Sequence, residues 1–203
     1  MLGLVALVAG VAGAAPPAPS AADVLAANAL VASFVKYCGD TDGDPDKALA
    51  AADADGWQTP PAGAMPPTIP VMGADGVAHM TPASAFKLES RVRTSGAGVL
   101  VLVLSDVPSS GGGLHSCSVG GRFNVDTGAL RDDLQRWAGG APITDRTTPM
   151  ATFIEFGLKF GAAGRQILDH DPMAKDPSEP GAATVAANVF RNMVTVTYSR
   201  TPG

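Results

Sequence analysis

The N-terminal part of the chain carries apolar residues at the spacing of an amphipathic helix. One apolar stripe predicts a helix from Ser20 to Cys38, and its members are Val24, Ala27, Val31, Phe34 and Cys38. Ser20 is a favourable N-cap, Asp23 follows in the first turn, and Gly39 suits the end of the helix. Cys38 should therefore point toward the core from the last turn.

A second, shorter helix is predicted after an acidic turn. Asp44 can cap it, and Pro45 fits its first turn, where a missing N–H costs nothing. Gly56 ends the pattern, and Trp57 is expected to pack as an apolar plug behind it. The inward-facing residues are Ala48, Leu49 and Ala52.

Residues 58–70 form a proline-rich stretch. The prolines in Thr59–Pro70 are too frequent for a helix or a central strand. We interpret the stretch as a loop over the surface of one domain, because the piece before it is too small to fold alone as a separate domain.

From Phe86 onward the period changes to that of strands. The first strand alternates between two sets, the apolar Phe86, Leu88 and Val92 and the charged Lys87, Glu89, Arg91 and Arg93. We expect the apolar set to be buried and the charged set to face water. After a turn at 95–98, Val99 to Leu104 is apolar at every position and predicts a central strand. A third strand places Cys117, Val119 and Phe123 on one face.

The remaining pattern gives one helix and further strands. The helix begins at Asp126 or Thr127, closes at Gly139-Gly140 and carries a stripe of Leu130, Leu134 and Trp137. A fourth strand has Ile154, Phe156, Leu158 and Phe160 on one face. After a proline-rich loop from Asp171 to Gly181, Thr184–Arg200 is either a hairpin or one long bent strand, with Val194, Val196 and Tyr198 on one face.

These elements predict an α+β fold. We expect an antiparallel sheet of about five strands, with the N-terminal helices and one inserted helix packed on one face. The links between the strands from Phe86 to Phe123 are short, which suits hairpins rather than parallel crossovers. Residues 15–203 should form a single domain.

The first residues predict export. Residues 1–14 are an apolar run, and Ala12 and Ala14 have the spacing of a signal-peptidase site, with 20–22 as a second possible cleavage region. A spanning helix needs about 20 apolar residues, and Pro16-Pro17 interrupts the run before that length. No Lys or Arg precedes the run, so either the true start lies further upstream or the terminal amine supplies the only positive charge. A retained anchor and a cytoplasmic protein are the alternatives. We expect a periplasmic or secreted protein with no membrane span after cleavage.

The charge of the chain argues against nucleic acid as a partner. The chain has 203 residues and a net charge of −5, with no block of like charges. It has no basic run for nucleic acid and no basic amphipathic helix for an anionic membrane. The partner is expected to be a protein or a small molecule.

The two cysteines of the chain predict one disulfide. An exported protein lies in an oxidising compartment, where disulfides form and persist. Cys38 and Cys117 each lie on the apolar stripe of their own element. The bond would hold the first helix across the sheet. Two buried free thiols are the alternative, and a metal site lacks the necessary second Cys or His at ligand spacing.

An acidic turn offers the one candidate metal site. Asp40, Asp42, Asp44 and Asp46 alternate as in a calcium loop. Pro45, however, stands where an EF-hand has its glycine, and Ala51 where it has its bidentate glutamate. We interpret Asp40–Asp46 as a solvated turn that caps a helix, with a calcium-stabilised module as an alternative. No cofactor is predicted.

The residues that could carry catalysis are scattered. His79, His115 and His170 are isolated, and no zinc spacing occurs among them. Ser109 and Ser110 lie near His115, but the chain has no nucleophile elbow and no phosphate-binding glycine loop. Trp57 and Trp137 are better explained as core or rim aromatics than as a ligand platform. We therefore expect a non-catalytic binding domain, with a small enzyme built from dispersed residues as the alternative.

Scattered residues also support a resemblance. Phe34 and Cys38, the acidic turn, the alanine-rich helix before Gly56-Trp57, and Cys117 followed by the Leu130/Leu134 helix resemble a group of uncharacterised exported proteins of proteobacteria. The resemblance implies secretion and the Cys38–Cys117 pairing, and it implies no activity.

Overall fold

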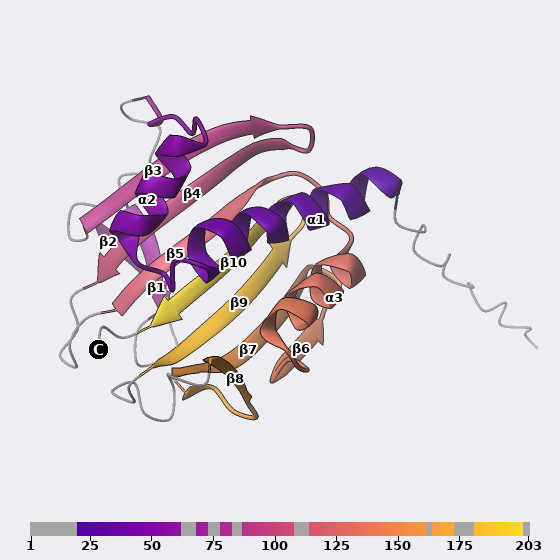
Figure 1. Cartoon of the computed structure of the whole chain (residues 1–203). Helices are drawn as coiled ribbons and strands as arrows, with labels where there is room; N and C mark the ends of the chain where they lie inside the picture. The colour runs from indigo at the N-terminus through magenta and orange to yellow at the C-terminus, as the bar shows by residue number, and fades with distance from the viewer. Residues whose placement is uncertain are drawn as a thin grey trace, which may run out of the picture.

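The computed structural model describes residues 20–61, 68–72, 78–82, 87–107, 114–161, 164–172 and 181–200. The predicted signal peptide 1–14, the Ser109/Ser110 loop and nearly all of the loop from Asp171 to Gly181 lie outside these residues. Within them the fold is α+β, as the pattern predicts (Figure 1).

One large antiparallel sheet forms the centre of the structure. Its strands lie in the order β3-β4-β5-β10-β9-β7-β6, and β8 also pairs with β7. The bounds are β3 Lys87–Ser95, β4 Gly98–Val107, β5 Leu114–Arg122, β6 Thr144–Thr147, β7 Ala151–Gly161, β8 Gly164–Leu168, β9 Ala182–Phe190 and β10 Met193–Arg200. A separate hairpin joins β1 Thr68–Met72 to β2 Ala78–Pro82. Residues 184–200 therefore form a hairpin rather than one bent strand.

The expected number of about five strands was too low. β6 and β8 are short and mostly exposed, so neither has the apolar alternation that identifies a strand. The proline-rich stretch was also wrong in part, because Thr68–Pro70 belong to β1. Each strand of a two-stranded hairpin has an unpaired outer edge, where proline is tolerated.

Local sequence signals set the ends of the helices. α1 Ala21–Phe34 begins with a capping box between Ser20 and Asp23 and continues into a π-helical turn, η1 Val35–Gly39. Asp44 caps α2 Pro45–Ala54, and Asp126 caps α3 Thr127–Ala138. Gly139 closes α3 with a φ of 89°, which glycine adopts without strain.

The core lies between the sheet and the helices, which cover the same face (Figure 1). Leu100, Leu102 and Leu104 of β4 point into it, as do Ile154, Phe156 and Leu158 of β7. The helices add fully buried residues from their apolar stripes, namely Ala27, Leu30, Phe34, Ala48, Ala52, Leu130 and Leu134. The predicted stripes are confirmed for most of their members, but Val24, Leu49 and Trp137 are only partly buried, and Leu30 was not among the residues predicted.

The predicted orientation of β3 was wrong. Arg91 and Arg93 pair with Leu102 and Leu100, which are core residues, so these two arginines face the helices. Val92 lies on the opposite face and is half-buried. Alternation shows that a strand has two faces but not which one the helices cover; here α2 supplies Asp53, whose carboxylate accepts from Arg91 Nε at 2.7 Å.

The predicted disulfide is present. Cys38 and Cys117 are bonded, with their Cα atoms 5.5 Å apart, and both are fully buried. The bond joins the π-helical end of the first helix to the middle of β5. Among the residues described, Ala21–Gly39 is the one helical stretch long and apolar enough to cross a membrane, but 44% of its most apolar window is buried and it packs on the sheet.

Candidate functional site

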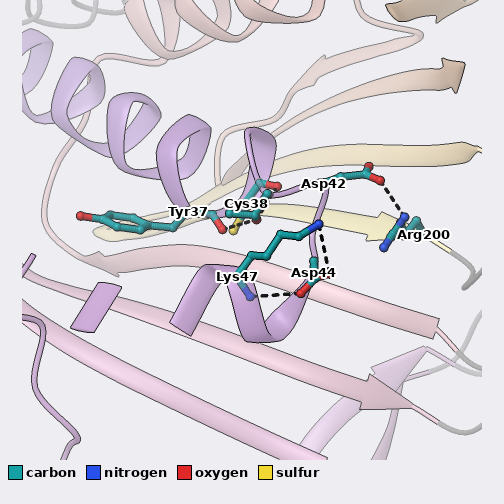
Figure 2. Close-up of polar contacts among 7 residues, drawn as sticks. Tyr37, Cys38, Asp42, Asp44, Lys47 and Arg200 are labelled. Atoms are coloured by element: carbon teal, nitrogen blue, oxygen red, sulfur yellow. Dashed lines mark hydrogen bonds and ion pairs between the residues drawn. The ribbon is translucent and has the colours of Figure 1, made fainter. Parts of the chain in front are cut away.

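The acidic turn is fastened to the C-terminal strand (Figure 2). The carboxylate of Asp42 accepts a hydrogen bond from the Tyr198 hydroxyl and another from Arg200 Nη1, the latter at 2.7 Å. Gly43 has a φ of 65° and lies so close to Tyr198 that a Cβ atom there would stand 2.6 Å from the ring. Burial and the Asp42 carboxylate raise the pKa of Tyr198 well above its usual range. This contact is an anchor between two distant parts of the chain.

The other carboxylates of the turn do not converge. Asp44 caps α2 by accepting from the backbone N–H of Lys47 at 3.0 Å, and this bond lowers the pKa of Asp44. Asp40 and Asp46 are exposed. No group of three or more potential metal ligands occurs in the described part of the chain. The geometry thus favours the capping interpretation of Asp40–Asp46 over a calcium loop.

A second polar cluster is tied to β3 by Arg93, whose Nη1 donates to the Tyr37 hydroxyl at 3.3 Å. The Tyr37 hydroxyl donates to Asp55, which also pairs with Lys36 Nζ at 2.5 Å. These two donors lower the pKa of Asp55, and burial raises the pKa of Tyr37. Trp57 is buried edge-on against Tyr37. The predicted plug is confirmed, and the cluster is structural.

One histidine has a partner of the kind used in catalysis. His115 Nδ1 and Asp106 Oδ1 are 2.5 Å apart across β4 and β5, and both side chains are partly exposed. A carboxylate that orients a histidine is half of a nucleophile-activating triad. Among the residues described, no hydroxyl or thiol is hydrogen-bonded to His115. His170 is a surface residue that contacts Asp169, and His79 lies in β2.

The cavities on the helix side are shallow. One of about 650 Å³ lies between α1 and α3, beside Lys36, Asp133 and Trp137. Trp137 is half-buried there, packed against Phe34 and under the Arg165 guanidinium at 4.2 Å. One of about 70 Å³ lies under α2, next to Asp106. The smaller cavity is lined by Asp46, Glu89 and Asp106, but its volume is far below the roughly 300–1,000 Å³ of a usual ligand pocket.

The exposed apolar side chains gather at one end of the sheet. They are Leu25 (68% exposed), Val99 (51%), Met150 (57%), Phe153 (39%), Phe190 (42%) and Met193 (46%). All six lie where β3, β5, β6 and β9 end and where β4, β7, β10 and α1 begin. We call this end of the sheet the apolar end. A cavity of about 480 Å³ opens there, between the first turns of α1 and the β3–β4 turn.

Three arginines stand among these side chains. Arg122 ends β5 and is paired with Met193, Arg146 is paired with Phe153, and Arg191 is in the β9–β10 turn. The Arg146 guanidinium lies 5.8 Å from the Phe153 ring, and that of Arg191 lies 5.6 Å from the Phe190 ring. All three are exposed, and none has a carboxylate partner in the described part of the chain.

Sequence reasoning missed the apolar end. Its members are spread from Leu25 to Met193, and single exposed apolar residues are common on protein surfaces. Arg122, Arg146 and Arg191 are also far apart along the sequence. A usable signal is that Phe190 and Met193 flank the β9–β10 turn and that Met150 stands between β6 and β7, where small polar residues are usual.

Comparisons with known proteins do not assign a function. No family model matches the chain, and no curated protein and no solved structure is significantly similar to it. The resemblance to exported proteobacterial proteins therefore stays a prediction.

Proposed function

We propose that this protein is an exported, non-catalytic binding domain that acts through the apolar end. One observation carries the proposal: every bulky apolar side chain that is exposed in the described residues lies at that end. Exposed apolar side chains that gather in one place mark an interaction site, whereas scattered ones need no explanation.

At the other end of the sheet, where β10 finishes, the polar groups point to a structural role rather than to a second binding or catalytic site. Its charged residues are used internally: Asp42 holds Tyr198 and Arg200, and Asp106 holds His115. A catalytic site would need such groups to converge on a cavity. Among the residues described, Glu155 of β7 is the one carboxyl with a raised pKa; burial raises it, and the hydrogen bond that Thr144 donates acts in the opposite direction. The enzyme alternative therefore has the weaker support.

Export is part of the proposal. The disulfide is consistent with an oxidising compartment, and the apolar run before Pro16 has the composition of a signal peptide. Mass spectrometry of the protein recovered from the periplasm or medium of an exporting host should give a chain that begins at Ala15. An intact N-terminus on protein that remains with the cells would contradict export.

A pair of fluorescent probes tests the binding surface. Anilinonaphthalene sulfonate is an anionic aromatic molecule, and N-phenylnaphthylamine is its neutral counterpart. We expect the folded protein to enhance the fluorescence of the sulfonate more strongly, because arginines surround the apolar side chains.

The matched variants are Phe190→Ser/Met193→Ser, which removes apolar surface, and Phe190→Leu/Met193→Leu, which keeps it. The serine pair should lose most of the enhancement and the leucine pair should keep it. Equal binding by the serine pair and the unsubstituted protein would place the binding surface elsewhere and overturn the proposal.

A further inference from the structure

We propose that the apolar end docks on the surface of an anionic phospholipid membrane. This inference rests on the proposed function and names a partner other than the protein or small molecule expected from the sequence. The geometry points to a bilayer interface because exposed apolar side chains and arginines without carboxylate partners among the described residues lie together at one end of the sheet, at strand ends, in turns and in the first part of α1. Such a surface places apolar groups among the lipid headgroups and cations against phosphates.

The width of the apolar end suits a broad partner. Val99 in β4 and Arg146 in β6 are separated by the strands β5, β10, β9 and β7. At the usual spacing of neighbouring strands this is about 24 Å. Phe153, Phe190 and Met193 line none of the three cavities described above. A drug-sized ligand is usually enclosed in a concave site, whereas a membrane can meet a wide and open surface.

The arginines give the apolar end positive charges, whereas the chain as a whole is negatively charged. The net charge of the protein is −5, yet Arg122, Arg146 and Arg191 stand at the apolar end without carboxylate partners among the described residues. The carboxylates near this end have other partners: Asp23 caps α1, Asp126 caps α3, and Asp145 pairs with Arg131 Nε at 2.6 Å. The charge complementarity is therefore to an anionic partner.

The turns are placed to reach a flat surface. The β3–β4 and β9–β10 turns and the start of α1 lie at the same end of the sheet, away from the β1–β2 hairpin (Figure 1). Met150, beside the start of β7, and the Phe190–Met193 turn present long side chains from separate loops. Apolar side chains at the strand ends and at Met150 can enter a headgroup layer together with the arginines beside them, because arginine extends its charged group toward phosphate while its stem stays apolar.

Vesicle co-sedimentation tests the inference with the processed, exported protein. The vesicles are phosphatidylcholine alone and an equimolar mixture of phosphatidylcholine and phosphatidylglycerol. The protein should bind the mixed vesicles, release on addition of salt, and bind the neutral vesicles much more weakly. Arg122→Gln and Arg191→Gln should each weaken binding by about fivefold. Arg136→Gln removes an exposed arginine of α3 far from this end and should bind like the unsubstituted protein.

The outcomes separate the two proposals. Loss of vesicle binding in the Phe190→Ser/Met193→Ser variant, with retention in the leucine variant, supports the membrane as partner. Vesicle binding that is equal in all variants would come from another part of the chain and would overturn the inference. If no vesicle binds while the anionic probe still binds at the apolar end, the membrane is the wrong partner and the proposed function stands.

Discussion

The two ends of the sheet are built in opposite ways. At the end where β10 finishes, Tyr198 and Arg200 hold Asp42 of the acidic turn, and the Cys38–Cys117 bond lies next to them because Tyr198 pairs with Cys117. At the apolar end, Phe190 and Met193 project into solvent, and Arg122 and Arg191 have no carboxylate partners among the described residues.

This difference separates groups that stabilise the fold from groups left available to a partner. A buried polar group stabilises only when it is paired, and the paired groups are at the acidic-turn end. An exposed apolar side chain adds little to the stability of the fold and lowers the solubility of the protein. Its presence is therefore better explained by binding to a partner. Substitutions at the two ends should therefore change different properties.

Removal of the disulfide should have the largest effect on stability. Cys38→Ala/Cys117→Ala opens a loop with a sequence separation of 79 residues and should lower the free energy of unfolding by about 2–5 kcal/mol. Urea unfolding of the oxidised protein and of this variant measures the loss. A loss below about 1 kcal/mol would mean that packing of α1 alone holds the helix on the sheet.

Tyr198→Phe should have the second largest effect on stability. It removes a hydrogen bond from a buried hydroxyl to the Asp42 carboxylate, and bonds to charged groups contribute about 1.5–3 kcal/mol. The double variant that also carries Asp42→Asn should lose less than the sum of the two single losses, because both changes break the Tyr198–Asp42 contact and only Asp42→Asn also weakens the ion pair with Arg200. Additive losses would show that Tyr198 and Asp42 act independently.

The same tyrosine gives a pH dependence. The pKa of Tyr198 is raised above the ordinary 10.0 by burial and by Asp42. The stabilising contribution of the neutral hydroxyl is therefore complete below pH 10.0 and is lost as the pH rises beyond it. Urea unfolding above this pH should show stability falling more steeply for the unsubstituted protein than for Tyr198→Phe; parallel curves would contradict the raised pKa.

The cap of α2 should have a smaller effect. Asp44→Ala leaves the Lys47 N–H without its side-chain acceptor and should cost about 1 kcal/mol. Asp46→Ala, an exposed position of the same turn, is the matched control and should change stability by less than about 0.5 kcal/mol. Equal losses would point to the charge of the turn rather than to the cap.

Substitutions at the apolar end should have the smallest effect on folding. Phe190→Ser/Met193→Ser should change the free energy of unfolding by no more than about 0.5 kcal/mol at each position, as is usual for exposed residues. Thermal and urea unfolding provide the check. A loss of several kcal/mol would show that these side chains belong to the core and would remove the contrast between the two ends.

The residues that could be predicted from the sequence are those set by local rules. Ser20, Asp44 and Asp126 cap helices because a short polar side chain there can reach the free N–H groups of the first turn. The disulfide followed from two cysteines that both faced the core. The buried side of β3 could not be predicted, because it depends on Asp53 from a helix that precedes it by some 40 residues of chain. The apolar end depends on which strand ends meet, and sheet order brings those residues together.

Residue-specific NMR of the labelled protein during titration with anilinonaphthalene sulfonate tests the central claim most directly. We predict that the amide signals that shift belong to the apolar end, above all those of Val99, Arg122, Phe153 and Phe190–Met193. Signals near His115 and Arg200 should stay in place. Shifts that gather instead around Asp106 and His115, or in the α1–α3 cavity beside Trp137, would contradict the assignment of the binding surface.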